Sequence, residues 1–431
     1  MDRMLTIGPT TEIVGEDKPI VHIEIGIRPS HPVPLEQLRL DWLSFLQGCT
    51  SLSDLEELPE HLQASLAGPM KQQILDEDGA PALLPPNAYE LFVHPYILHD
   101  DEPAVEELEP GSDGDEWTAA CDSWSLPHTS LQGLWESLLF EENLGRDLLE
   151  YARSALLFAD RGISNHIVHW NRLLLLHGPP GTGKTSLCRS LAHKLSIRLG
   201  HRFARTTLLE IHSHSLFSKW FSTSGKLIHR LFDLVKDMVT DDPEALTVVL
   251  IDEIESLAGS RQALGSGGEP SDALRAVNSL LTSLDRLRVF PNVLILATTN
   301  LTDAVDEAFL DRADLQVYVP TPCLEARYEI LRTCLLELMR VGLVVTQALE
   351  NYAAVLQEPE ESTSSSTALL QLAAETKGES GRSLRRLPLQ AHALFIRNNG
   401  RPVVLTQFLY AIRGALQHGQ REPSELDESD I

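Results

Sequence analysis

One short segment constrains the fold of this chain more than any other. Residues 178–185 read Gly-Pro-Pro-Gly-Thr-Gly-Lys-Thr, a complete match to the pattern G-x-x-x-x-G-K-[ST]. An apolar run over 167–177 precedes the segment, and a helix is predicted over 186–199 after it. Glycines let such a loop bend until successive N–H groups point inward at a helix N-terminus, which forms a nest for phosphate oxygens. The segment therefore predicts a strand, a phosphate-binding loop and a helix in that order.

The side chains of this loop indicate which ligand it takes. Lys184 supplies a positive charge for the β- and γ-phosphates of a nucleotide, and the Thr185 hydroxyl can bind Mg²⁺. We therefore expect ATP and Mg²⁺ as cofactors. The alternative is a Gly- and Pro-rich turn that merely contains a lysine, and the strand and helix on either side argue against it. The residues expected to surround the nucleotide are Gly178, Pro179, Pro180, Gly181, Thr182, Gly183, Lys184, Thr185 and Asp252.

Polar residues follow two further apolar segments at positions where hydrolysis needs them. Asp252 and Glu253 come directly after Val-Val-Leu-Ile at 248–251. Because ligands bind beyond the carboxyl ends of parallel strands, Asp252 is predicted to hold Mg²⁺ through water, and Glu253 to orient and deprotonate the attacking water. An acid pair that starts a helix is the alternative. Asn300, after the next strand, is predicted to place its amide between the γ-phosphate and that water, and a cap on the following turn is the alternative.

Strand-length apolar segments alternate with helix-length intervals through the middle of the chain. The expected strands are 167–177, 206–211, 246–251, 293–298 and 315–319. Such alternation is typical of a parallel sheet covered by helices on both faces. Beyond Pro320 helices dominate, and they are expected at 324–339, 367–375, 382–396 and 405–416.

The first hundred residues have a different pattern. Alternating apolar residues predict a strand over 20–27, helical spacing predicts a helix over 35–46, and another strand is expected over 89–97. Residues 100–116 are rich in acids and contain no Lys or Arg, which is typical of a solvated linker. The chain is thus predicted to be an α/β protein with a small α+β N-terminal domain (1–100), an acidic linker (101–117), a P-loop parallel sheet domain (118–320), a helical lid domain (321–418) and an acidic tail (419–431).

Charge and composition argue against several classes of partner. The chain has 62 acidic residues against 35 Lys and Arg, a formal net charge of −27. Binding to a phosphate backbone needs clustered cations, so no direct nucleic-acid partner is expected. Apolar runs are too short to span a bilayer, so no membrane partner is expected. The five scattered cysteines have no C-x-x-C spacing, which favours neither a disulfide framework nor a zinc site.

These motifs resemble the AAA+ ATPase superfamily, in its protein-remodelling branch, over roughly residues 118–420. Residues 308–322 resemble the arginine-finger region of that family, which implies that Arg312 reaches the nucleotide site of a neighbouring subunit. An ion pair with Asp311 or Asp314 at the surface is the alternative for this arginine.

Two further segments share the resemblance. Ser380-Gly381-Arg382 is similar to the second sensor motif, which implies that Arg382 reaches the γ-phosphate from the lid; Arg385 and Arg386 on the same helix leave the register open. Residues 214–226 occupy the position of the central pore loop of AAA+ unfoldases, which implies that Trp220 and Phe221 grip a substrate polypeptide. A flat aromatic side chain can hold many different peptide sequences. A tryptophan packed against its own domain is the alternative.

A narrower resemblance covers nearly the whole chain. Residues 173–187, 214–226, 269–273 and 380–388, with a weaker match around 21–27, are similar to the family of pachytene checkpoint protein 2 homologs. Membership implies a hexameric ATPase that remodels HORMA-domain proteins with the help of a HORMA-like adaptor, which docks with the substrate on residues 1–100. It implies roles in disassembly of the spindle checkpoint complex and in control of meiotic chromosome axes and recombination. The implied location is the nucleus and cytoplasm, with chromosome association in meiosis.

Two other functions remain open from the sequence alone. A motor of the same fold could act on nucleic acid, although the net charge and the aromatic pore loop oppose this. A non-hydrolysing, ATP-bound scaffold is the other alternative, and the presence of Lys184, Asp252, Glu253 and Asn300 argues against it. The catalytic residues expected for a hydrolase are Glu253, Asn300, Arg312 and Arg382.

Overall fold

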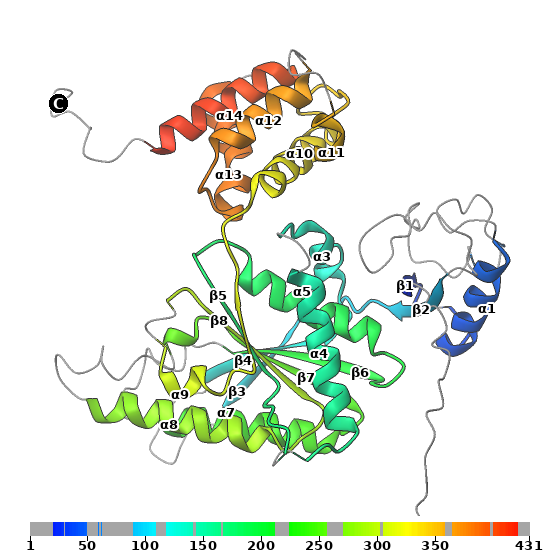
Figure 1. Ribbon diagram of the computed structural model, residues 1–431, viewed down its shortest axis with the longest axis vertical. Coiled ribbons are helices and arrows are strands. Elements are labelled where there is room, and N and C mark those ends of the chain that lie inside the picture. The colour runs from blue at the N-terminus through cyan, green and yellow to red at the C-terminus, as the bar shows by residue number, and fades with distance from the viewer. Residues whose placement is uncertain are drawn as a thin grey trace, which may run out of the picture. The chain divides into compact units, whose positions relative to one another are not determined.

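The chain forms two compact units, residues 1–98 and 99–431, which are described separately (Figure 1). The computed structural model describes residues 20–29, 31–49, 59, 62, 89–108, 118–140, 144–164, 167–211, 224–256, 270–301, 305–357, 364–396 and 400–420. Within these ranges no helix is both long and apolar enough to cross a membrane.

The first unit is built on two parallel strands and one helix. Strand β1 (Ile20–Ile27) pairs in parallel with β2 (Glu90–Ile97), and helix α1 (Leu35–Gly48) lies between them in sequence. Alternate residues of β1 from Val21 to Ile27 are buried, as the period of a strand requires. Leu38, Trp42 and Leu46 recur every four residues on α1 and pack into the same core. The predicted strands and helix of this unit are confirmed.

The second unit contains a seven-stranded sheet in the order β3-β4-β6-β7-β8-β5-β9. The five strands from β6 to β9 in that order are parallel, and β3 and β4 add an antiparallel edge. The carboxyl ends of these five parallel strands therefore lie along one side of the sheet, its carboxyl edge, and their amino ends lie along the opposite side, its amino edge. The strands are β3 (Ala104–Leu108), β4 (Thr118–Leu126), β5 (Leu173–His177), β6 (Arg205–Ile211), β7 (Ala245–Ile251), β8 (Val293–Thr299) and β9 (Leu315–Tyr318).

Two predictions about this sheet need correction. Residues 104–108 form β3, with Leu108 buried, where the sequence predicts an irregular acidic linker over 101–117. Pairing with β4 supplies the backbone hydrogen bonds that make this acidic segment a strand, and residues 109–117 lie outside the described residues. Strand β5 begins at Leu173 and not at Ile167, because only residues 173–177 pair with β8.

Helices cover both faces of the sheet. Helices α4 (Leu144–Asp160) and α5 (Lys184–Arg198) pack on the face that includes Leu174 and Leu176 of β5. Helices α7 (Ser224–Asp241) and α8 (Pro270–Leu287) pack on the opposite face, which includes Leu173 and Leu175. Successive leucines of β5 thus enter opposite cores, and this explains its uninterrupted apolar sequence. The short elements of this part are η2 (Thr129–Leu131), α3 (Leu134–Ser137), η3 (Ile254–Ser256) and α9 (Glu307–Leu310).

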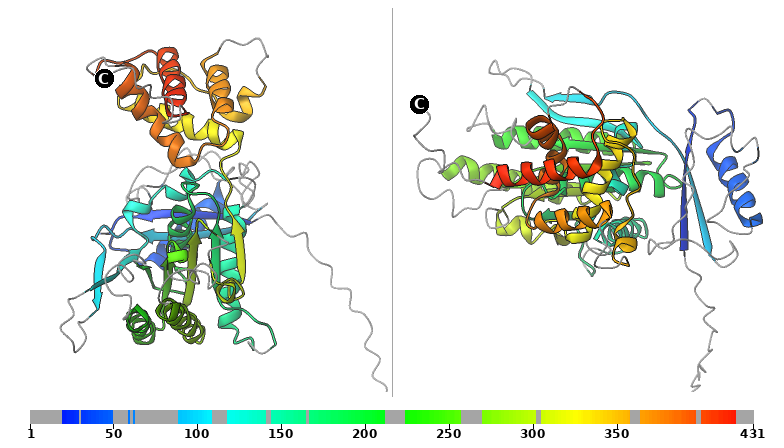
Figure 2. Two further views of the ribbon diagram at one scale, coloured as in Figure 1. Left: turned by 90° about the vertical axis from the view of Figure 1, so that its left-hand side faces the viewer. Right: turned by 90° about the horizontal axis from the view of Figure 1, so that it is seen from above.

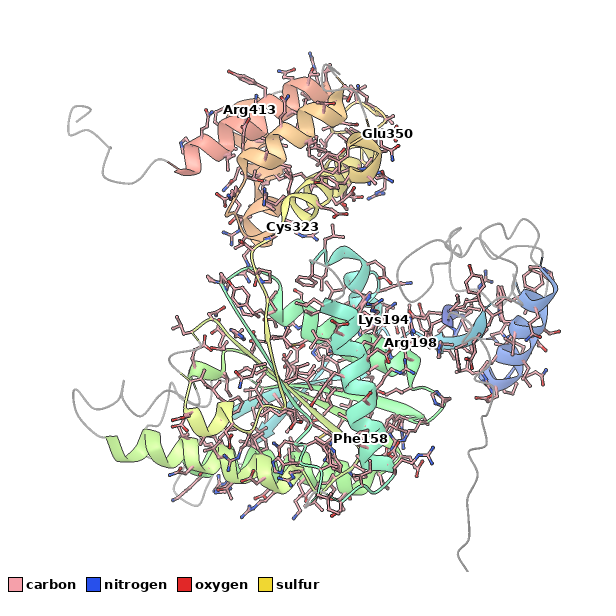
Figure 3. All side chains as sticks on the ribbon, viewed as in Figure 1. Phe158, Lys194, Arg198, Cys323, Glu350 and Arg413 are labelled. Atoms are coloured by element: carbon pink, nitrogen blue, oxygen red, sulfur yellow. The ribbon has the colours of Figure 1, made fainter. Side chains whose placement is uncertain are left out.

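The remainder of the second unit is a helical bundle, which Figure 2 shows in yellow to red. It comprises α10 (Leu324–Arg340), α11 (Tyr352–Val355), α12 (Ser365–Glu375), α13 (Gly381–Ala391), the π-helical turn η6 (His392–Ile396) and α14 (Leu405–Gln420). Its core is separate from those of the sheet and includes Tyr328, Leu372, Leu384 and Phe408. Cys323 caps α10 where the bundle begins, and its sulfur accepts the N–H of Ala326 at 3.5 Å (Figure 3). The predicted helices are confirmed, except that 382–396 ends as a π-helical turn.

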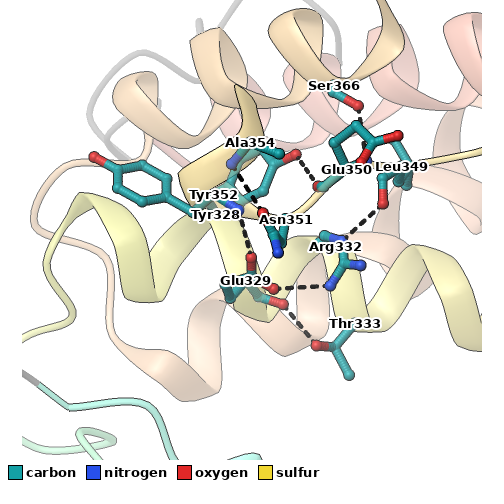
Figure 4. Close-up of polar contacts among 10 residues, drawn as sticks. All are labelled: Tyr328, Glu329, Arg332, Thr333, Leu349, Glu350, Asn351, Tyr352, Ala354 and Ser366. Atoms are coloured by element: carbon teal, nitrogen blue, oxygen red, sulfur yellow. Dashed lines mark hydrogen bonds and ion pairs between the residues drawn. The ribbon is translucent and has the colours of Figure 1, made fainter. Parts of the chain in front are cut away.

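Polar side chains of α10 fix the irregular segment that leads to α11 (Figure 4). The Tyr328 hydroxyl donates to the Glu350 carbonyl at 2.7 Å, and the Glu329 carboxylate accepts the Tyr352 N–H at 2.8 Å. Arg332 donates to the Leu349 carbonyl at 3.0 Å. These bonds satisfy backbone groups that no helix or strand supplies with partners, so the segment is held to α10.

Candidate nucleotide site

Glycines shape the loop between β5 and α5. Gly178, Gly181 and Gly183 all have positive φ, at 143°, 76° and 99°. A Cβ on Gly178 would collide with the Val319 carbonyl, and one on Gly181 would lie 2.8 Å from the Ser380 hydroxyl. Gly183 is the N-cap of α5 and has no side chain to occupy the first N–H groups of the helix. The loop is therefore a cradle with exposed helix-dipole charge, which fits the phosphates of a nucleotide.

Lys184 lies against this cradle and is buried. Its ammonium donates to the carbonyls of Gly178 at 2.8 Å and Pro179 at 2.7 Å. Burial lowers the pKa of Lys184, while the nearby carboxylates of Glu255 and Asp252 act to raise it. The lysine thus lies within the electrostatic reach of two acids that follow β7.

An oxygen-rich group lies beside the first turn of α5. The Thr185 hydroxyl donates to Asp252 Oδ1 at 2.8 Å, and the Thr298 hydroxyl donates to the same oxygen. Hydroxyl and carboxylate oxygens are the hard ligands that Mg²⁺ takes. The two residues predicted to hold the metal, Thr185 and Asp252, are therefore in contact and fit it chemically.

Glu253 follows Asp252 and adopts φ of 54°, a left-handed conformation that glutamate rarely occupies. Its N–H donates to Thr298 Oγ1 at 3.2 Å, which holds this conformation in place. A strained non-glycine residue beside a ligand cradle is typical of functional sites.

Asn300 lies at the same edge of the sheet, one residue beyond β8. β8 lies between β7 and β5, so Asn300 is between the Asp252–Glu253 pair and the phosphate loop. Its N–H donates to Glu255 Oε1 at 3.1 Å. The structure thus brings Asn300, Asp252 and Glu253 together with the loop.

The start of α13 contacts the phosphate loop. The Arg382 N–H donates to the Gly181 carbonyl at 3.2 Å, and the Arg382 charge also acts on Lys184 to lower its pKa. Arg385 instead donates to the carbonyl of Ser137, the last residue of α3, at 2.8 Å. Of the neighbouring arginines left open by the sequence, Arg382 is the one whose backbone bonds to the loop.

Arg312 lies at the amino edge of the sheet, on the side opposite to the phosphate loop. It precedes β9, and its carbonyl accepts a hydrogen bond at 2.8 Å from the side chain of Asn171, which precedes β5. Its guanidinium forms two bonds of 2.9 Å with Asp285 of α8 and one of 2.8 Å with the Ala308 carbonyl. The ion-pair partner is thus Asp285, whereas the sequence suggested Asp311 or Asp314. The hydrogen bond to Asp285 raises the pKa of Arg312.

Several residues of this site were not predicted from the sequence. Leu138 and Phe140 lie 3.5 and 3.7 Å from where a Cβ of Gly183 would be, so an apolar wall stands beside the loop. Leu139 between them packs against the core of the helical bundle. Thr298 and Glu255, which contact Asp252 and Asn300, were not predicted either. The apolar run Leu138-Leu139-Phe140 ahead of α4 signals the wall, whereas nothing in the sequence signals Thr298. The predicted pore residues Trp220 and Phe221 lie outside the described residues.

Comparisons with known proteins agree with this geometry. Residues 174–321 match the ATPase family associated with various cellular activities (AAA), and residues 323–420 match the TRIP13-like AAA+ ATPase lid C-terminal domain. The fold and site define an AAA ATPase, which binds ATP and hydrolyses it. The helical bundle is its lid.

Relatives are similar over most of the chain. Pachytene checkpoint protein 2 homologs of Danio rerio and Homo sapiens are 38% and 37% identical, over 96% and 95% of this chain and 97% and 95% of their own lengths. The homolog of Oryza sativa subsp. indica is 48% identical over 77% of this chain and 71% of its own. The chain belongs to the family of pachytene checkpoint protein 2 homologs.

Solved structures agree. C. elegans PCH-2 superimposes with a TM-score of 0.71 and 30% identity, and the match covers 93% of this chain and 99% of that one. A chain in the E. coli MS115-1 HORMA:CdnC:Trip13 complex matches with a TM-score of 0.52, 18% identity and coverage of 68% and 93%, and shares the fold.

Proposed function

We propose that this ATPase uses hydrolysis to remodel HORMA-domain proteins, with a HORMA-like adaptor. The observation that carries the proposal is similarity to pachytene checkpoint protein 2 homologs over 95–96% of the chain, which extends beyond the AAA domain into the first unit. A protein of the same fold, the E. coli Trip13, was solved together with a HORMA protein. In this proposal residues 1–100 dock substrate and adaptor.

The chemistry follows from the residues at the carboxyl edge of the sheet. Lys184 and the N-terminus of α5 hold the phosphates in the glycine cradle. Glu253 takes the proton of the attacking water, and Asn300 holds that water against the γ-phosphate. Arg382 brings a positive charge from the lid to the same phosphate, so that nucleotide binding draws the lid to the loop. Thr185 and Asp252 hold Mg²⁺, which when bound neutralises phosphate charge.

Arg312 suits a role between subunits. It lies at the sheet edge opposite to the phosphate loop of its own chain, and this position supports a role at the nucleotide of a neighbour. A head-to-tail interface of this kind generates a closed ring when the rotation between subunits closes. We propose a hexamer in which Arg312 completes the adjacent site.

The mechanical part of the proposal rests on Trp220 and Phe221. Hydrolysis would move the lid against the sheet domain and carry these aromatic residues, which grip the polypeptide, along the ring axis. In cells the substrates would be HORMA proteins of the spindle checkpoint and of meiotic chromosome axes, where recombination is controlled. The protein would then act in the nucleus and cytoplasm and on meiotic chromosomes.

The decisive experiment measures conversion of a purified HORMA protein between its two conformers by ion-exchange chromatography, with adaptor and ATP. We expect conversion with the native chain and none with Glu253→Gln, which binds ATP but turns it over at least about 10²-fold more slowly. Trp220→Ala should keep ATP hydrolysis and lose conversion, because it removes grip without touching phosphates. Native chain that hydrolyses ATP yet never converts the HORMA protein would overturn the proposal.

A further inference from the structure

Two hydrogen bonds join the segment after β7 to the end of β8 and to the residue that follows β8. The Glu253 N–H donates to Thr298 Oγ1 at 3.2 Å, and the Asn300 N–H donates to Glu255 Oε1 at 3.1 Å. Thr298 also donates its own proton to Asp252. The strands themselves end at Ile251 and Thr299, so beyond them side chains replace the ladder of backbone hydrogen bonds.

Glu255 is the less expected half of this connection. It lies in the turn η3, which the fully buried Ile254 anchors in the core of the sheet. Its Oε1 accepts the Asn300 N–H, while its Oε2 is buried and receives no hydrogen bond from any residue in the described part of the chain. A buried carboxylate oxygen without a donor is destabilising. A buried oxygen of this kind calls for an explanation, and a functional role is one.

We propose that Glu255 is a positioning residue for ATP hydrolysis: it holds Asn300 in register with Glu253. This inference rests on the proposed role of Asn300. With the Glu255 bond intact, the Asn300 amide and the Glu253 carboxylate belong to one rigid group at the end of β7 and β8. Without it, the segment after Thr299 loses its anchor, and the attacking water is held less well while the phosphates remain bound.

The test compares kcat for ATP hydrolysis with the Kd for a fluorescent ATP analogue. We expect Glu255→Ala to lower kcat by about tenfold to a hundredfold, because small misplacements in a site have such effects, while Kd changes less than about threefold. Glu255→Gln keeps an oxygen that can accept the Asn300 N–H, so it should return kcat to within about fivefold of the native value. Glu337→Ala, an exposed acid paired with Arg340 on α10, is the matched control and should change nothing.

A double-mutant cycle identifies the residue through which Glu255 acts. If it acts through Asn300, adding Glu255→Ala to Asn300→Ala should lower kcat no further than about threefold. Fully additive losses, a Kd that weakens as much as kcat falls, or no rescue by glutamine would overturn the inference while Asn300→Ala alone still impairs hydrolysis. An Asn300→Ala variant with native kcat would instead refute the proposed role of Asn300, and the inference with it. Should Glu255→Ala fail to fold, Glu255→Asp, one methylene shorter, serves in its place.

Discussion

Three arginines in unusual surroundings show how one residue type serves different ends in this protein. Arg172 is buried and has a φ of 57°. Its guanidinium donates to the carbonyls of Arg288 and Phe290, which follow α8, and of Val293, the first residue of β8, so it fixes the connection between α8 and β8. Arg312 is held by Asp285 at the surface. Arg382 meets the phosphate loop. The partners of each guanidinium or backbone group, and not the residue type, therefore distinguish a structural arginine from a candidate functional one.

The contact of Arg382 leads to a prediction at this scale. In the proposed mechanism the Arg382 side chain brings a positive charge to the γ-phosphate, so Arg382→Ala should lower kcat for ATP hydrolysis by about 10²-fold. Arg385→Ala, on the same helix but bonded to Ser137, is the matched control and should retain most of the activity. Steady-state phosphate release measures both variants. Equal losses in the two variants would contradict the assignment of Arg382.

At the scale of elements, the lid depends on bonds from α10 to the chain that follows it. Tyr328 is fully buried, and its hydroxyl is bonded to the Glu350 carbonyl at 2.7 Å. Strands show a comparable dependence: β3 is acidic and forms because β4 pairs with it, whereas β7 and β8 are mostly apolar and are buried at every position. Strands with a continuous apolar run can therefore be predicted from the sequence, whereas a strand that depends on pairing with a neighbour cannot.

Tyr328→Phe tests the first of these dependences. Removing the hydroxyl leaves the Glu350 carbonyl without this donor and should destabilise the lid by about 0.5–1.5 kcal/mol. Tyr410→Phe is the control, since Tyr410 is 76% exposed and should change stability by less than about 0.5 kcal/mol. Urea unfolding followed by far-UV circular dichroism measures both. A Tyr328→Phe variant as stable as the native chain would show that water replaces the lost bond.

At the scale of the whole molecule, the two edges of the sheet carry different candidate site residues. The carboxyl edge gathers Lys184, Asp252, Glu253 and Asn300, whereas Arg312 lies at the amino edge. In the proposed mechanism hydrolysis needs Arg312 as well as these residues, so one site would be completed by two copies of the chain and hydrolysis would depend on assembly.

Mixing two inactive variants tests this link. Arg312→Ala and Glu253→Gln should each lower kcat by at least about 10²-fold on their own. In mixed rings some sites combine an intact Glu253 with an intact Arg312 from the neighbour, so mixing should restore part of the activity. Mixtures that remain as inactive as the separate variants, at concentrations where size-exclusion chromatography shows rings, would rule out action between subunits.

The sequence by itself determined the phosphate loop, the parallel strands, the acid pair after β7 and the helices of the lid, because each depends on local pattern: glycine spacing, apolar runs and helical periodicity. Tertiary structure alone decided that Arg382 meets Gly181, that Asp285 binds Arg312, that Glu255 anchors Asn300, and that residues 104–108 form a strand. Those contacts join residues from separate elements, and their partners become neighbours only when the sheet is ordered and the helices pack upon it.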